Sequence, residues 1–161
     1  MVYLLLVSNN LLYNYIYIIM YPQKYIPKSL SESDKKKQKK QLDKSVKDYK
    51  KGIYTERKPL SSFKSKPSSY VIETKKDLGI TNVKPETIAN KLARTEKRKK
   101  ELKEGLEKIL LKGKGAFYSS GSRPNQSPYS WGLSRVSSVL QGGPARKIDK
   151  KIVDKYKIPK L

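Results

Sequence analysis

Apolar side chains recur at helical spacing along most of this chain, and no stretch shows a convincing strand pattern. Leu42, Val46 and Tyr49 follow one another at i, i+4 and i+7 in a lysine-rich stretch. Ser31 opens this stretch with the spacing of a capping box, and Gly52 stands where a helix can end. The pattern predicts a helix with a thin apolar stripe and a strongly basic remainder.

Further helices are predicted between residues 68 and 158. Ser68 or Ser69 can cap a short helix that stops at Gly79. The charged stretch that follows is compatible with one long helix, or with two helices and a turn near Thr95. Its second half carries apolar residues at i, i+4, i+7 and i+8, namely Leu102, Leu106, Ile109 and Leu110.

The best-marked helix has the sequence SPYSWGLSRVSSVLQGG. Ser127 can be its N-cap, Pro128 suits its first position, and Gly142 can end it. A last helix is predicted over PARKIDKKIVDKYK. The sequence therefore predicts a mostly α protein, with a small helical domain at residues 68–158. A basic extended N-terminal arm, a helix and a linker precede this domain at residues 20–67.

Residues 1–19 are apolar and uncharged. Their length approaches the roughly 20 residues that a membrane-spanning helix needs, although Asn9 and Asn14 interrupt the apolar run. Three interpretations stay open, and we favour the first: codons upstream of a true start at Met20, a membrane anchor, or an apolar segment that packs on the protein. A signal peptide is not indicated, because a positive n-region and a cleavage site are both absent, so we expect no secretion.

Composition narrows the classes of function. The chain of 161 residues has 37 Lys and Arg against 14 Asp and Glu, a formal net charge of +23. This excess favours a polyanionic partner, nucleic acid first and an anionic membrane second, although AT-rich codon usage also raises the lysine content. Cys and His are absent, which excludes disulfides, thiolate or imidazole metal sites and histidine bases. We expect no cofactor, no metal and no catalytic residue.

The stretch Gly113–Gly132 reads GKGAFYSSGSRPNQSPYSWG, and its glycines predict a loop from Gly113 that leads into the helix after Ser127. It lies between Glu107 and Asp149, where no acidic residue occurs. Glycines let backbone N–H groups approach a phosphate, Arg123 can pair with it, and the helix that starts after Ser127 favours anions. The order of a P-loop is absent. Phosphate or nucleic-acid binding is predicted for Lys112, Lys114, Gly115, Ser120, Gly121, Ser122, Arg123, Asn125, Gln126, Arg135, Arg146 and Lys147. The alternative is a loop that folds on its own side chains.

Three aromatic residues are candidates for stacking on bases. Phe63 lies in the basic linker, and Tyr118 and Trp131 lie in the acid-free segment. The alternative is that all three rings are buried against the helices, which is the usual position of large aromatics in a small protein.

Three segments resemble one protein family: YIPKSLS at Tyr25–Ser31, SFKSK at Ser62–Lys66, and above all GAFYSSGSRPNQSPYSWGLSRVSSVLQGGPA at Gly115–Ala145. They are similar to small basic proteins that large nucleocytoplasmic DNA viruses of algae and protists encode. The resemblance covers most of residues 21–150, and its GSRPNQ…SWG…R…GG string is specific. The family has no assigned activity, so no catalytic residue is carried over. The resemblance implies a viral origin and a place in the virion or the virus factory of the host.

These observations favour a non-enzymatic protein that binds nucleic acid, DNA rather than RNA, largely through phosphates. A structural virion protein is the first alternative, with the arm at residues 21–30 and the linker at 53–69 contacting capsid or other virion proteins. A membrane partner is expected only if residues 1–19 are translated. A small metal-dependent nuclease is the last alternative, because Asp149 and Asp154 are poorly placed to share one ion.

Overall fold

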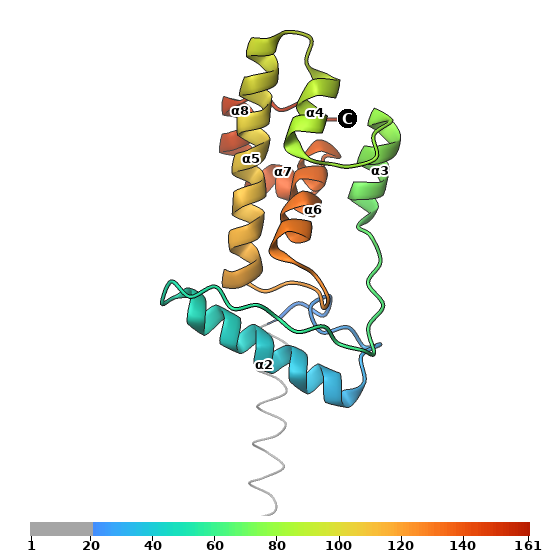
Figure 1. The fold of residues 1–161 in the computed structure, drawn as a ribbon, viewed down its shortest axis with the longest axis vertical. Coiled ribbons are helices and arrows are strands. Elements are labelled where there is room, and N and C mark those ends of the chain that lie inside the picture. The colour runs from blue at the N-terminus through green and yellow to red at the C-terminus, as the bar shows by residue number, and fades with distance from the viewer. Residues whose placement is uncertain (1–20) are drawn as a thin grey trace, which may run out of the picture. The chain divides into compact units, whose positions relative to one another are not determined.

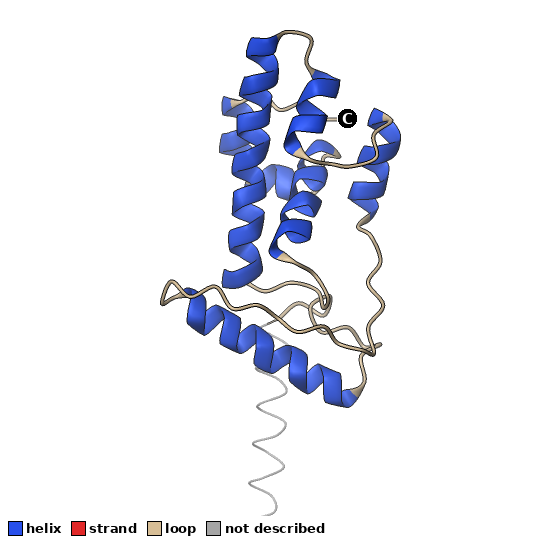
Figure 2. Cartoon of the chain, in the orientation of Figure 1, coloured by secondary structure: helices blue, strands red, loops and turns tan. Residues whose placement is uncertain are grey.

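A computed structural model describes residues 21–161, and the predictions for residues 1–19 lie outside them. Seven helices and no strand occur in the described residues, so the predicted mostly α fold is confirmed (Figures 1 and 2). None of these helices has both the length and the apolar character that crossing a bilayer requires.

The described residues form two compact units, and the residues of each unit pack mainly against one another. We define the arm unit as residues 21–64 together with Ser120–Asn125. The helical unit consists of Ser65–Ser119 and Gln126–Leu161. Six residues of the acid-free segment, which were predicted to belong to the helical domain, therefore pack with the N-terminal part of the chain.

The arm unit contains a single helix within the described residues, α2 (Glu32–Tyr49). Ser31 is its N-cap, and the Ser31 hydroxyl accepts a hydrogen bond of 3.2 Å from the Asp34 N–H, as the capping-box spacing predicted. Gly52 follows the helix with φ +76°, a conformation that favours glycine. The buried apolar side chains of the unit are Tyr21, Leu30, Leu42 and Leu60.

The helical unit contains α3 (Ser69–Leu78), α4 (Pro85–Leu92), α5 (Glu96–Ser119), α6 (Pro128–Leu140), α7 (Pro144–Ile148) and α8 (Lys150–Lys155). Of the two arrangements predicted around Thr95, the structure has two helices with a turn. Helices α5 and α6 pack side by side, α4 and α8 pack on α5, and α3 packs on α6 (Figure 1). The centre of the core is made of fully buried side chains: Ile88, Leu102, Leu106, Ile109, Val136, Val139 and Leu140.

Two predictions about element boundaries are wrong. The predicted loop from Gly113 is helical as far as Ser119, because α5 continues through it. A Cβ atom on Gly113 would lie 2.6 Å from the Gly132 Cα, so this glycine serves the close crossing of α5 and α6. The predicted last helix is divided into α7 and α8, since Asp149 leaves the helical region with ψ +19°.

Candidate nucleic-acid interface

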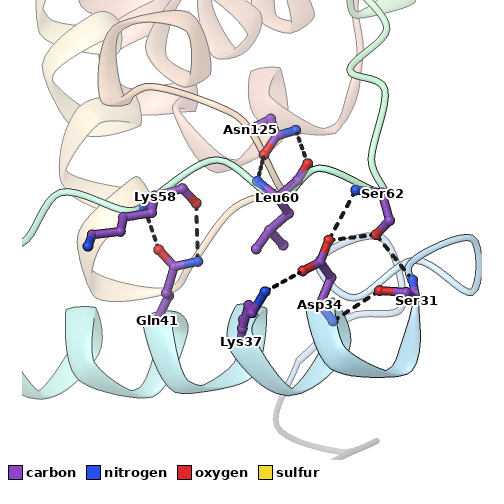
Figure 3. A network of polar contacts seen from close by, with 8 residues as sticks. All are labelled: Ser31, Asp34, Lys37, Gln41, Lys58, Leu60, Ser62 and Asn125. Atoms are coloured by element: carbon purple, nitrogen blue, oxygen red, sulfur yellow. Dashed lines mark hydrogen bonds and ion pairs between the residues drawn. The ribbon is translucent and has the colours of Figure 1, made fainter.

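The inner face of α2 holds the linker through polar side chains (Figure 3). Asp34 is buried and accepts hydrogen bonds from the Ser62 hydroxyl (2.7 Å) and the Ser62 N–H (3.1 Å), with Lys37 at 3.3 Å. These bonds, those from Ser62 first, hold the pKa of Asp34 below its ordinary value. Gln41 donates to the Lys58 carbonyl (3.2 Å) and accepts from the Lys58 N–H. The linker is thus fixed along one side of the helix.

Asn125 holds the same linker from its other side (Figure 3). Its side-chain oxygen accepts the Leu60 N–H at 2.7 Å, and its amide group donates to the carbonyls of Leu60 (3.0 Å) and Phe63 (2.8 Å). Asn125 adopts φ +55°, a conformation that asparagine tolerates better than most residues. The predicted phosphate ligand therefore uses its side chain to satisfy linker backbone groups.

The loop before Asn125 is directed into the arm unit. Gly121 is buried with φ +93°, and a Cβ on it would lie 3.2 Å from the Tyr25 ring. The buried Ser122 hydroxyl accepts from Arg57 at 3.0 Å and donates to the Arg123 carbonyl at 2.9 Å. The Arg123 side chain is exposed and makes no hydrogen bond or ion pair within residues 21–161. Arg123 is consequently the cation of this loop that remains available to a ligand.

The N-terminus of α6 is closed by a reciprocal capping box. The Ser127 hydroxyl accepts the Ser130 N–H, and the Ser130 hydroxyl accepts the Ser127 N–H, both at 3.0 Å. Pro128 has no N–H to offer. Gln126 accepts the Ser130 hydroxyl at 2.9 Å and donates to Ser65 at 3.2 Å. Most donors of the predicted anion site are thus already bonded within the helical unit.

Asp149 forms ion pairs with two of the predicted phosphate ligands, Lys112 and Arg135. Its fully buried carboxylate accepts Arg135 Nε at 2.7 Å and Nη2 at 2.9 Å, and Lys112 Nζ lies at 2.8 Å. Burial raises the pKa of Asp149, but the bonds from Arg135 and Lys112 outweigh burial and hold the pKa below its ordinary value. Arg135 and Lys112 are therefore the counter-charges of a buried carboxylate.

Arg146 binds backbone carbonyl groups near the C-terminal end of the chain. Its guanidinium donates to the carbonyl groups of Val139 (3.1 Å), Ile158 (2.9 Å) and Pro159 (3.0 Å). These bonds tie the last residues to the end of α6, so the planar group satisfies backbone acceptors within the helical unit.

The remaining predicted ligands lie apart from these clusters. Lys114 and Gly115 are half-buried on α5, Lys147 is exposed on α7, and Ser120 is exposed in the loop. The three candidate stacking rings are each half-buried, and the Tyr118 ring lies edge-on to Phe117 at 5.1 Å. Nothing in these positions tests their assignment, which stays a prediction.

The outer face of α2 carries a row of exposed lysines that was not among the predicted phosphate ligands. We define the lysine face as Lys36, Lys40, Lys44 and Lys47, all of which are exposed. The buried residues of α2 are Asp34, Gln38, Leu42 and Ser45. The two sets have the same spacing and are offset by two residues, or about 200° around the helix, so they lie on opposite sides. This offset is visible in the sequence once the buried face is known.

Few groups neutralise the lysine face. Lys44 pairs with Asp48 at 2.6 Å, while Lys36, Lys40 and Lys47 make no hydrogen bond or ion pair within residues 21–161. Like charges at i, i+4 destabilise a helix by about 0.2–0.5 kcal/mol per pair. The free protein therefore maintains this face at a small cost in helix stability.

Acidic groups of the described chain are scattered. Asp154, the second candidate of the nuclease alternative, pairs with Lys150 at 2.5 Å. Residues 21–161 contain no group of three or more His, Cys, Asp or Glu residues that could hold a metal ion.

Fold and charge together define the class: a small basic protein, helical throughout its described part, with a cationic outer face on the helix of its arm unit. No protein-family model, curated protein or solved structure matches the chain.

Proposed function

We propose that this protein binds nucleic acid without catalysing a reaction, and that the lysine face of α2 is its main contact with phosphates. The observation that carries the proposal is that three of the four lysines of this face make no hydrogen bond or ion pair within residues 21–161. Lysines that serve only solubility are commonly accompanied by acids on the same helix surface. Here Lys44 is the one lysine of the face with an acidic partner, Asp48, within the described residues.

Both long helices form ion pairs one turn apart, such as Lys35–Glu32 (2.6 Å) in α2 and Lys99–Glu96 (2.7 Å) in α5. What distinguishes α2 is the arrangement of its unpaired lysines, which stand in one row on the side opposite its buried residues. This arrangement supports a polyanionic partner for α2.

The dimensions of the lysine face suit a nucleic-acid strand. Lys36 and Lys47 are eleven residues apart, or roughly 16 Å along the helix axis. One DNA strand carries a phosphate about every 3.4 Å along the duplex axis, so the face matches about five phosphates. Binding through phosphates is independent of sequence. We propose DNA rather than RNA as the partner, and association with a viral genome in the virion or virus factory, on the basis of the family resemblance.

A salt titration of the full chain tests the proposal. Affinity for a DNA oligonucleotide is measured by fluorescence anisotropy at several NaCl concentrations, for the natural protein and for K36Q/K40Q/K47Q. Because each phosphate contact contributes about 0.9 to the slope of log K against log salt, we expect the triple variant to reduce that slope by about 2 to 3.

The matched control is K91Q/K97Q/K100Q, which removes three exposed lysines from α4 and α5 of the helical unit. It changes the net charge equally, so we expect only a small change in slope. Equal slopes for the two triple variants would reject the lysine face as the contact. Failure of the natural protein to bind DNA would reject the function itself.

A further inference from the structure

The turn after α2 presents apolar side chains beside exposed lysines at the C-terminal end of the helix. Ile53 is 53% exposed and Tyr54 is 64% exposed, the largest exposed fraction of any aromatic ring in the described residues. They follow Lys50 and Lys51, which are both exposed. Exposed aromatic rings beside cationic side chains are typical of sites that bind single-stranded nucleic acid.

The backbone of this turn is held firmly. The Gly52 N–H donates to the Tyr49 carbonyl and the Ile53 N–H to the Asp48 carbonyl, both at 3.0 Å. These two bonds, with Gly52 at φ +76°, form a Schellman motif. The Thr55 hydroxyl donates to the Asp48 carboxylate, which pins the residue after Tyr54 to the same helix end.

The Tyr54 ring is also positioned. Its centroid lies 5.8 Å from that of Tyr49, with 81° between the ring planes. Such an edge-to-face pair restricts the ring while it leaves most of the Tyr54 surface to solvent. A ring that is fixed before binding loses less conformational entropy when a ligand stacks on it.

Charge around the turn favours an anionic chain. Residues 47–58 contain five Lys or Arg and two acids, Asp48 and Glu56. Asp48 is already engaged by Lys44 and Thr55. A polyanion that reaches Tyr54 therefore meets a local surface with an excess of positive charge.

We propose that Ile53 and Tyr54, beside Lys50 and Lys51, form a base-stacking platform, and that the nucleic acid which this protein binds is single-stranded. This inference rests on the proposed function and specifies its ligand. In a duplex the base faces are covered by neighbouring base pairs, so a surface tyrosine cannot stack on them. In a single strand every base presents a π-face to such a ring.

Three probes of equal length separate stacking from charge. They are a single-stranded DNA 12-mer, the same 12-mer with four consecutive abasic nucleotides, and the blunt duplex. The abasic probe keeps its phosphates and loses base faces. For the full-length natural protein we expect tightest binding to the intact single strand, with on the order of tenfold weaker binding to the abasic probe.

Variants at Tyr54 complete the test. We expect Y54A to weaken binding of the intact single strand on the order of tenfold and to leave the abasic probe unaffected, and Y54F to bind like the natural protein. Y129A is the matched control, because Tyr129 is 42% exposed on α6 of the helical unit. Circular dichroism of each variant verifies that α2 is retained.

The outcomes distinguish the two proposals. If the natural protein binds none of the three probes, the proposed function fails. If it binds all three with equal affinity and Y54A has no effect, polyanion binding stands and the platform is overturned. An equal loss for Y54A and Y129A on the intact strand would also overturn it.

Discussion

Asp149 is the single acidic residue between Glu107 and Asp154, and its carboxylate is fully buried. Arg135 binds it through two nitrogen atoms and Lys112 through a third. A paired buried charge contributes little net stability, but removal of one partner leaves the other uncompensated. The positive charge of the acid-free segment is therefore partly held in place by this one residue.

We expect D149N to lower the free energy of unfolding by about 2–4 kcal/mol, since it leaves the largely buried Arg135 guanidinium without a counter-charge. Urea denaturation followed by circular dichroism measures the change. The control is D154N, which removes an exposed ion pair with Lys150 and should change stability by less than about 1 kcal/mol. Similar losses of unfolding free energy for D149N and D154N would show that the buried Asp149 ion pairs matter no more to stability than an exposed pair.

At the scale of helices, the crossing of α5 and α6 depends on two glycines. Gly113 and Gly132 face each other, and a Cβ on Gly132 would lie 2.7 Å from the Leu110 carbonyl oxygen. Backbone atoms of a helix cannot move aside as the end of a long side chain can, so the two helices have to separate to admit a methyl group.

We expect G132A to lower the free energy of unfolding by about 1–3 kcal/mol, even though alanine favours a helix more than glycine does. Thermal and urea denaturation measure the effect. S134A, at a half-buried position two residues further along α6, should change stability by less than about 0.5 kcal/mol. A G132A protein as stable as the natural one would contradict a requirement for close contact between α5 and α6 at this position.

Local signals predicted the helix ends well. Ser31 and Ser127 are N-caps, Pro128 occupies the first position of α6, and the left-handed glycines follow α2, α3 and α6. Each depends on residues within one turn, which a sequence displays directly. The length of α5 was missed because Gly113 resembles a loop glycine until its partner, nineteen residues away, is known.

Non-local pairing explains what else the sequence did not indicate. Asn125 resembles a phosphate ligand in a glycine-rich loop, but its amide bonds to Leu60, 65 residues earlier. In the sequence, Arg135 and Lys112 resemble free cations, because their ion pairs with Asp149 form only in the folded protein. Spacing along the chain contains no information about such pairs.

At the scale of the whole molecule, a net charge of +23 makes each of the 14 acids important to stability. Four acids, of which Asp34 is buried, have their pKa held below the ordinary value by hydrogen bonds, first those from Lys35 to Glu32, Ser62 to Asp34, Lys44 to Asp48 and Tyr156 to Glu104. The pKa of Asp149 is likewise lowered, against the effect of its burial.

Acid should therefore destabilise the protein. A carboxyl group whose pKa is lower in the folded state stabilises that state above its unfolded pKa, and this stabilisation is lost as pH falls through the folded pKa. We expect the free energy of unfolding to decline below about pH 4.5, and the difference between natural protein and D149N to narrow over the same range. Urea titrations from neutral pH to about pH 2.5 test this. A constant difference at all pH values would contradict a role for the Asp149 charge.

The division of the arm unit into two separated segments affects the order of events during synthesis. Residues 21–64 leave the ribosome first, but the partner of Leu60 lies 65 residues further on and that of Gln38 lies 84 further on. Helices α3, α4 and α5 emerge in the interval. Closure of such long loops is entropically costly and slow. Residues 21–64 therefore lack part of their hydrogen-bonding partners until the chain has been translated as far as Asn125. A nascent chain that stops before Asn125 cannot complete the folding of the arm unit.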